Sequence, residues 1–153
     1  MNGEVSAEQA QKIIAMLTEG GAIENVNAPL ALRLIPLAEE LGNTDLVERL
    51  LKHAESSAAD ELESGWVKFE TLRNASSSVD EFVELAAMAE KMAAGKPLAA
   101  AVLHHVGLLY LSAEQYDDCQ VFTTRSMRLR EQIEDQAGLV YSLAVLEACD
   151  KRQ

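Results

Sequence analysis

The sequence is poor in aromatic residues, proline, cysteine and positive charge, and each shortage narrows the possible folds. Phe, Trp and Tyr make up only 5% of the 153 residues, so alanine and leucine supply most of the apolar surface. Both residues are strong helix formers. No run of Val, Ile or Thr is long enough to suggest a β-sheet. We therefore expect a single all-α domain over residues 1–153, a length sufficient for a hydrophobic core.

The shortage of positive charge argues against polyanionic partners. Thirteen Lys and Arg residues face 25 Asp and Glu residues, which gives a formal net charge of −12. A phosphate backbone or an anionic membrane surface would be repelled, so neither nucleic acid nor a membrane is an expected partner. The one basic cluster, Arg125, Arg128 and Arg130, is interpreted as a solvated helix face near a helix end, where cations suit the helix dipole.

The chain contains two cysteines, Cys119 and Cys149, which lie far apart in sequence in apolar helical contexts. We interpret them as two buried thiols of a reducing compartment. The first residues, MNGEVSAEQAQKII, lack the basic and apolar regions of a signal peptide. No apolar run approaches the roughly 20 residues of a membrane-spanning helix. These absences predict a soluble, cytoplasmic protein.

Capping residues and helix breakers mark the expected helices. Ser6 has Gln9 three residues later and Ser78 has Glu81, the pattern of a capping box. Pro36 should kink or break its helix. Two further N-caps are expected at Thr44 and Asp135. The predicted elements are a leading helix 6–19, three helix pairs at about 28–56, 59–94 and 97–132, and a trailing helix 135–150.

An internal repeat underlies these helix pairs. Large apolar residues recur at intervals of about 35–40 residues, and small residues recur in the second helix of each pair. A helix pair of this length cannot bury its own apolar face, so neighbouring pairs are expected to stack. The large residues are Leu34, Phe69, Val106 and Leu146, and the small ones are Ala54, Ala89 and Ser126.

The segment from Leu103 to Leu129 resembles the tetratricopeptide repeat family, and the resemblance is clearest over residues 98–149. The family pattern of a large residue, Leu-Gly, Tyr, a small residue, an aromatic and a small residue is matched by Leu103, Val106, Gly107, Tyr110, Cys119, Phe122 and Ser126. The earlier repeats carry Ile35 and Glu70 at the glycine position. The resemblance implies a right-handed α-solenoid of about eight antiparallel helices arranged as helical hairpins.

Gly107 and the adjacent histidines have structural interpretations within this pattern. A glycine inside a helix costs about 1 kcal/mol relative to alanine, so Gly107 should mark a close helix contact. The resemblance implies that this contact lies beside Cys119. His104 and His105 point about 100° apart on a helix, which argues against a shared metal ion. The resemblance implies that His104 faces a concave groove and that His105 packs toward a neighbouring helix. We expect no metal site.

Catalytic patterns are weak in this sequence. Cys119 could pair with a histidine, but it occupies a small packing position, where a buried thiol is unreactive. The segment EGGAI lacks the Lys-Ser/Thr of a phosphate-binding loop and the strand before it. Paired acids such as Glu39-Glu40 suit helix ends and solvated faces. We therefore expect no enzyme and no cofactor.

The expected function is binding of a peptide or protein segment in the concave groove. By the resemblance, the groove is lined by Leu32, Pro36, Val67, Thr71, His104, Leu108 and Leu111. This mostly apolar lining suits a segment with apolar anchors. The family's clamp for a C-terminal carboxylate is absent, because the matching positions hold His104, Leu108 and Val145. Two alternatives stay open: a small chaperone for one client, for example of a secretion system, and a self-associating assembly module.

The trailing helix is apolar on nearly every side, which predicts burial on more than one face. Leu139, Leu143 and Leu146 form the stripe expected to pack on the preceding pair. The other face is expected to contact a homodimer partner, a client protein or the leading helix folded back against it. It consists of Val140, Tyr141, Ala144, Val145 and Ala148.

Overall fold

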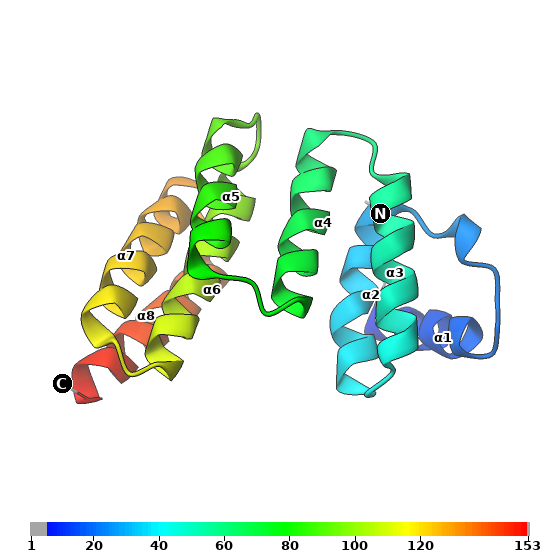
Figure 1. Ribbon diagram of the computed structural model, residues 1–153, viewed down its shortest axis with the longest axis horizontal. Coiled ribbons are helices and arrows are strands. Elements are labelled where there is room, and N and C mark those ends of the chain that lie inside the picture. Colours follow the sequence, from blue (N-terminus) through cyan, green and yellow to red (C-terminus); the bar gives the residue numbers. More distant parts are fainter. Residues whose placement is uncertain (1–5, 153) are drawn as a thin grey trace. The chain divides into compact units, whose positions relative to one another are not determined.

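The computed structural model describes residues 6–152, with side chains described to residue 150. This part of the chain is helical, with eight α-helices, one short 3₁₀-helix and no strand, which confirms the all-α prediction (Figure 1). The elements are α1 (Ala7–Thr18), η1 (Ile23–Asn25), α2 (Ala28–Glu40), α3 (Thr44–Ser57), α4 (Glu61–Asn74), α5 (Val79–Lys91), α6 (Lys96–Ser112), α7 (Tyr116–Gln132) and α8 (Gln136–Arg152). Only η1 has no counterpart in the predicted elements.

Both predicted capping boxes are present. The Ser6 hydroxyl accepts a hydrogen bond from the Gln9 backbone N–H (3.1 Å), and the Gln9 side chain accepts one from the Ser6 backbone N–H (3.0 Å). At the start of α5, Glu81 accepts from the backbone N–H of Ser78 (3.3 Å). These side chains satisfy backbone donors that lack partners within the helix.

Two details around α2 and α3 differ from the sequence-based expectation. The N-cap of α3 is Asn43, whose Oδ1 accepts from the backbone N–H of Leu46 (3.2 Å), and Thr44 is the first helical residue. Pro36 lies inside α2 without ending it. Its neighbours Leu34 and Ile35 are fully buried, and their packing compensates for the hydrogen bond that proline cannot donate.

One type of turn recurs after five of the helices. Each turn places one residue in the left-handed region, and the next residue donates its backbone N–H to a carbonyl five positions earlier. This closure satisfies carbonyl groups left free at a helix end. The left-handed residues are Gly20, Gly42, Ser76, Glu114 and Glu134.

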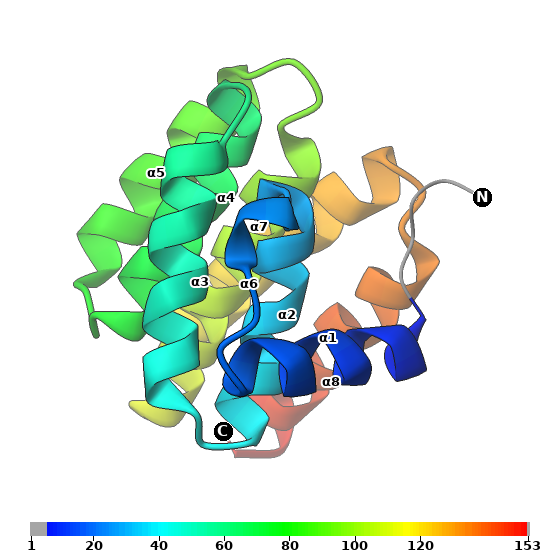
Figure 2. The ribbon, with the colours of Figure 1, turned by 90° about the vertical axis from the view of Figure 1, so that its right-hand side faces the viewer.

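The chain divides into two compact units, Met1–Thr71 and Leu72–Gln153. In the first unit α2 and α3 lie side by side, and α1 runs across α2 (Figures 1 and 2). Its apolar core also includes Val67 of α4. Arg49 of α3 donates to the carbonyl of Leu17 at the end of α1 (3.1 Å), and His53 contacts the carbonyl of Val26. These polar contacts fasten α1 and the η1 segment to α3.

The second unit packs its helices in chain order: α5 on α6, α6 on α7, and α7 on α8 (Figure 1). Phe82 of α5 is buried, and its ring lies 4.9 Å from the ring of His105 on α6. This contact confirms that His105 packs toward a neighbouring helix. Burial, and secondarily the charge of Arg73, lowers the pKa of His105, so the neutral ring is favoured there.

Positions identified by the internal repeat are mostly buried. Leu34 and Val106 are fully buried and Phe69 is 7% exposed, whereas Leu146 is only half-buried. The small residues Ala54, Ala89 and Ser126 are all fully buried. The repeat therefore identifies core positions correctly, except in the last helix.

Gly107 lies where α6 and α7 approach closely, as predicted. A Cβ atom at this position would lie 2.3 Å from Oγ1 of the buried Thr123 and 3.6 Å from the carbonyl oxygen of Cys119. The first distance is too short for any real contact, so the absence of a side chain permits the approach. The sequence identified the contact but not Thr123 as its nearest member.

Candidate functional site

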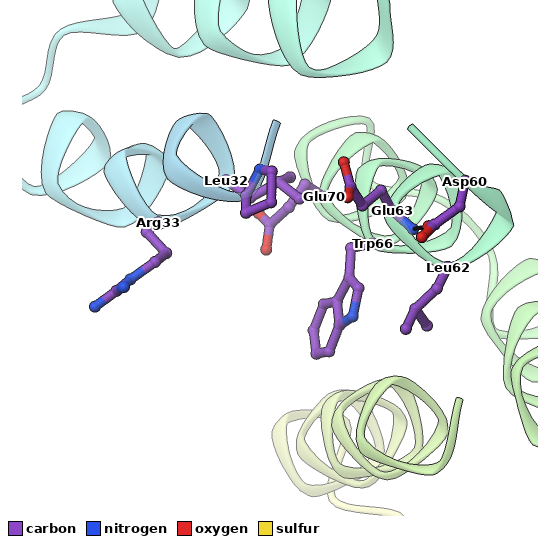
Figure 3. A pocket seen from close by; sticks show the side chains of 8 residues that line it. Leu32, Arg33, Asp60, Leu62, Glu63, Trp66 and Glu70 are labelled. Atoms are coloured by element: carbon purple, nitrogen blue, oxygen red, sulfur yellow. Dashed lines mark hydrogen bonds between the residues drawn. The ribbon is translucent and has the colours of Figure 1, made fainter. Parts of the chain in front are cut away.

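The first unit contains an apolar pocket between α2 and α4, with a volume of ≈ 470 Å³ (Figure 3). Pro29 and Leu32 line it from α2, and Leu62 and Trp66 line it from α4. Trp66 and Leu62 point to the same side of α4. The indole of Trp66 is half-buried and lies 6.3 Å from the ring of Phe69 in a tilted arrangement. A flat, partly exposed aromatic wall of this kind suits an inserted apolar side chain.

Charged side chains surround this pocket. Three carboxylates, Asp60, Glu63 and Glu70, and one guanidinium, Arg33, belong to its lining. Asp60 accepts from the backbone N–H of Glu63 (2.8 Å), and Glu63 accepts from that of Ala59 (3.2 Å), so both acids also cap the start of α4. These four charged residues form the rim of the pocket, which is acidic overall. The hydrogen bonds of the helix cap hold Asp60 and Glu63 in place.

The predicted groove residues of the first unit have unequal accessibility. Leu32 lines the pocket, and Pro36 and Thr71 are exposed. Val67 is only 5% exposed and belongs to the core, so its placement in a binding groove is wrong. Adjacent positions on a helix point about 100° apart, and it is Trp66 that reaches the pocket. The sequence signal for this site is Trp66, the only tryptophan of the chain.

In the second unit, a buried arginine joins α6, α7 and α8. Arg130 is 9% exposed, and its Nη1 donates to the Gly138 carbonyl (3.0 Å) and to the Ser142 hydroxyl (2.8 Å). The same nitrogen lies 3.2 Å from Nδ1 of His104, and Nε lies 4.0 Å from Asp135. The interpretation of this arginine as part of a solvated face is therefore wrong. It holds only for the other two cluster members, Arg125 and Arg128, which are exposed.

The partner of His104 fixes its protonation. A guanidinium group can only donate, so Nδ1 of His104 accepts and the proton of the neutral ring is on Nε2. Burial, followed by the charges of Arg130 and His105, lowers the pKa of His104 from 6.5 to about 4. His104 is therefore neutral at pH 7 and acts as an acceptor within the α6–α7–α8 contact. The other predicted groove residues of this unit, Leu108 and Leu111, are 37% exposed and half-buried respectively.

Helix α8 packs through a different face from the predicted one. Its buried stripe consists of Gly138, Ser142, Val145 and Cys149, whereas Leu139 and Leu146 are half-buried. Leu143 is 57% exposed, so its predicted inward packing is wrong, and Val145 is only 8% exposed rather than free. A Cβ on Gly138 would lie 2.7 Å from Nε of Arg130. The arginine side chain occupies the α7–α8 contact, and small residues are needed opposite it.

The outward face of α8 is apolar. Val140 is 66% exposed and Tyr141 is 64% exposed, and Leu143 belongs to the same surface. Ala144 is also exposed and Ala148 is half-buried. Of the five residues predicted for a partner face, Val140, Tyr141 and Ala144 are thus accessible.

The two cysteines face each other across α7 and α8. Their sulfur atoms are 2.6 Å apart, and both residues are fully buried. Burial, followed by the contact with Cys119, raises the pKa of the Cys149 thiol to about 12. The predicted burial is confirmed. The proximity was missed, because the spacing of 30 residues reveals it only once the pairing of α7 with α8 is known.

Comparison with known proteins gives no relative for this chain. No protein-family model matches it, and neither a curated protein nor a solved structure shows a significant match. Among the residues that the structure describes, no helix has the length and apolar character needed to cross a membrane. In the same part of the chain, His, Cys, Asp and Glu form no group of three or more that could hold a metal ion.

Proposed function

We propose that this chain is a non-catalytic protein-interaction scaffold that binds a peptide segment through the pocket at Trp66. The observation that carries the proposal is the ≈ 470 Å³ pocket with four apolar lining residues and a charged rim. Pockets with mostly apolar walls and a few polar groups are the usual form of binding sites. A single large apolar side chain of a partner would fill the space beside the indole.

A solenoid of helical hairpins of the tetratricopeptide type is the architecture that we propose for this scaffold. Turns of one type after α2, α4, α6 and α7 support it, since short connections favour antiparallel neighbouring helices. The burial of equivalent positions along the repeat supports it as well. Arrays of this kind characteristically present surfaces for partner binding.

The rim chemistry defines the expected ligand more closely. Asp60, Glu63 and Glu70 outnumber Arg33 around the opening, and the chain as a whole has a net charge of −12. Electrostatic complementarity favours a partner of opposite sign and speeds its association. We therefore propose a segment with a Leu, Met or aromatic anchor next to Lys or Arg residues.

The single tryptophan allows a direct test. Peptides carrying one apolar anchor and varied flanking charge are titrated against the protein, and Trp66 fluorescence reports whether the pocket is occupied. Peptides with basic flanks should bind, and Leu32→Glu should abolish binding while Met88→Glu, an exposed site in α5, should not. Binding that is unaffected by Leu32→Glu, or that prefers acidic flanks, would contradict the proposal.

Self-association is a second candidate function, and the exposed apolar face of α8 favours it. Val140, Tyr141 and Leu143 are each more than half exposed, and adjacent apolar side chains of this size commonly mark protein contacts. Sedimentation velocity over a range of concentrations tests this candidate. Tyr141→Glu combined with Leu143→Glu should convert an oligomer to a monomer, with Met88→Glu as the matched control. A protein that is monomeric before any substitution excludes it.

A further inference from the structure

We propose that Cys119 and Cys149 form a reversible intramolecular disulfide that fastens α8 to α7. The sulfur atoms are 2.6 Å apart, so only a small movement separates them from the S–S bond length of about 2.05 Å. The two residues lie on helices that already pack together. This inference does not depend on the proposed peptide-binding function.

The surroundings of the sulfurs make the pairing specific. The chain contains no third cysteine, so no competing intramolecular pairing exists. Val145 completes the buried cluster, with the partly buried Tyr110 and Tyr116 packed against it. Next to the cluster, Gln120 of α7 donates to Asp150 of α8 (2.7 Å), which holds the two helices in register at this end.

The disulfide would lie at the opposite end of α8 from the hydrogen bonds of Arg130. The contacts of Arg130 reach Gly138 and Ser142 in the first half of the helix, whereas Cys149 lies near its end. Oxidation would close a loop between positions 119 and 149 and limit the freedom of the unfolded chain. Helix α8 would then be held covalently at one end and by hydrogen bonds at the other.

The reaction requires a two-electron acceptor, and we propose a low-molecular-weight disulfide such as oxidised glutathione. The thiolate of Cys119 attacks one sulfur of the oxidant, breaks its S–S bond and releases one thiol, which leaves a mixed disulfide. Cys149 then gives up its proton and attacks the Cys119 sulfur, which releases the second thiol. Two protein thiols are oxidised, one disulfide is reduced to two thiols, and the two protein protons end on the released thiols.

The test uses the full chain, refolded from denaturant in mixtures of reduced and oxidised glutathione, because refolding exposes both buried sulfurs. The product should be a monomer without free thiols, lighter by the mass of two hydrogen atoms, and its peptide map should contain a Cys119–Cys149 link. The equilibrium constant for forming the disulfide with glutathione should be larger in the folded protein than in the denatured chain, on the order of 100-fold. The midpoint of thermal unfolding should rise by about 5–15 °C and return on reduction.

Two free thiols after refolding, a stable mixed disulfide with glutathione, or a disulfide-linked dimer would each overturn the proposal. Cys149→Ser and Cys119→Ser are the matched controls. Neither should show any change in the thermal midpoint with the glutathione ratio. If a serine variant does not fold, the thiol count and peptide map of the unsubstituted chain still decide the outcome.

Discussion

The two compact units build their interiors differently. In the described part of the chain, all four buried polar or charged residues lie in the second unit, and the buried core of the first unit is apolar. The four are Thr123, Ser126, Arg130 and Ser142. Ser126 donates to the Ala100 carbonyl (2.7 Å), which joins α7 to α6, and Arg130 joins α7 to α8. The second unit therefore has directional bonds in its buried interior, whereas the hydrogen bonds of Arg49 and His53 in the first unit lie at partly buried positions.

This difference bears on how strictly each unit fixes its geometry. Apolar burial is roughly proportional to area and has no direction, so it tolerates small shifts between helices. A buried hydrogen bond does not tolerate such shifts, because a donor or acceptor left without a partner costs about 1–3 kcal/mol. A slide of α8 by one turn along α7 would break both bonds from Arg130 to α8. The polar contacts thus specify the register of the last two helices.

Removing the arginine should have the largest effect. Arg130→Met leaves Ser142 Oγ and His104 Nδ1 without their buried donor, and we expect a loss of about 2–4 kcal/mol in the free energy of unfolding. Chemical denaturation followed by circular dichroism measures it. An equal loss for Arg128→Met, an exposed arginine two residues away on the same helix, would show that burial is not the cause.

A triple variant tests whether unsatisfied hydrogen-bonding groups cause this loss of stability. His104→Leu, Arg130→Met and Ser142→Ala together replace the polar contact with an apolar one like the interior of the first unit. Because no partner is then left unsatisfied, most of the loss should be recovered. A triple variant as unstable as Arg130→Met alone would indicate that shape, rather than hydrogen bonding, dominates this contact.

The next effect concerns the close approach of α6 and α7. Gly107→Ala should destabilise the protein by about 1–3 kcal/mol, because the new Cβ would overlap Thr123 Oγ1. In a Thr123→Ala background the overlap disappears, and the same change should stabilise by up to about 1 kcal/mol through helix propensity. Unfolding free energies of the four proteins in this cycle give the coupling. Additive effects would mean that the two residues do not compete for space.

A smaller effect should depend on pH. The folded-state pKa of His104 is about 4, below its ordinary value of 6.5, so between these values the unfolded chain binds more protons than the folded one. Stability from this group is therefore complete above pH 6.5 and is lost as the pH falls toward 4. The difference in thermal midpoint between the unsubstituted protein and His104→Gln should shrink over this range. A constant difference would place the histidine outside the buried contact.

The smallest effect concerns the turns. The first unit has Gly20 and Gly42 in the left-handed position of these turns, whereas the second unit has Ser76, Glu114 and Glu134 there. Glu134→Gly should stabilise by about 0.5–1 kcal/mol, since glycine adopts positive φ without strain. Gly42→Ala should cost a similar amount, although a Cβ there meets open space. Thermal midpoints of the two variants should shift in opposite directions.

Much of the fold could be predicted because its signals are local. The capping pairs of Ser6 and Ser78 involve residues three apart, and Asp135 caps α8 as expected by accepting from the Gly138 N–H (2.9 Å). Gly107 stood out because glycine is unfavourable inside a helix. Each of these signals depends on the residue and its near neighbours, and the structure agrees with each.

The packing of α8 could not be predicted in the same way. Its leucines suggested one buried face, but the helix turns Gly138 and Ser142 inward to receive Arg130. An arginine is normally a surface residue, and only the three-dimensional contact shows that its donors are satisfied. The pairing of Cys119 with Cys149 follows from that same orientation of α8.

The pocket at Trp66 could be predicted only in part. Leu32 was predicted as a groove residue from the family resemblance, yet Trp66 and not Val67 reaches the cavity from α4. A one-residue difference on a helix changes the direction of a side chain by about 100°, so a degenerate repeat can assign the correct turn and the wrong residue.

The buried arginine also has a consequence for the order in which the chain assembles. Its bonds to Gly138 and Ser142 join residues only 8 and 12 positions apart, whereas the two cysteines are separated by 30. Short loops close at a lower entropic cost and contacts between near neighbours form faster. The Arg130 contact therefore favours early docking of the start of α8 on α7, and the sulfur atoms meet afterwards, as the rest of the helix comes into place.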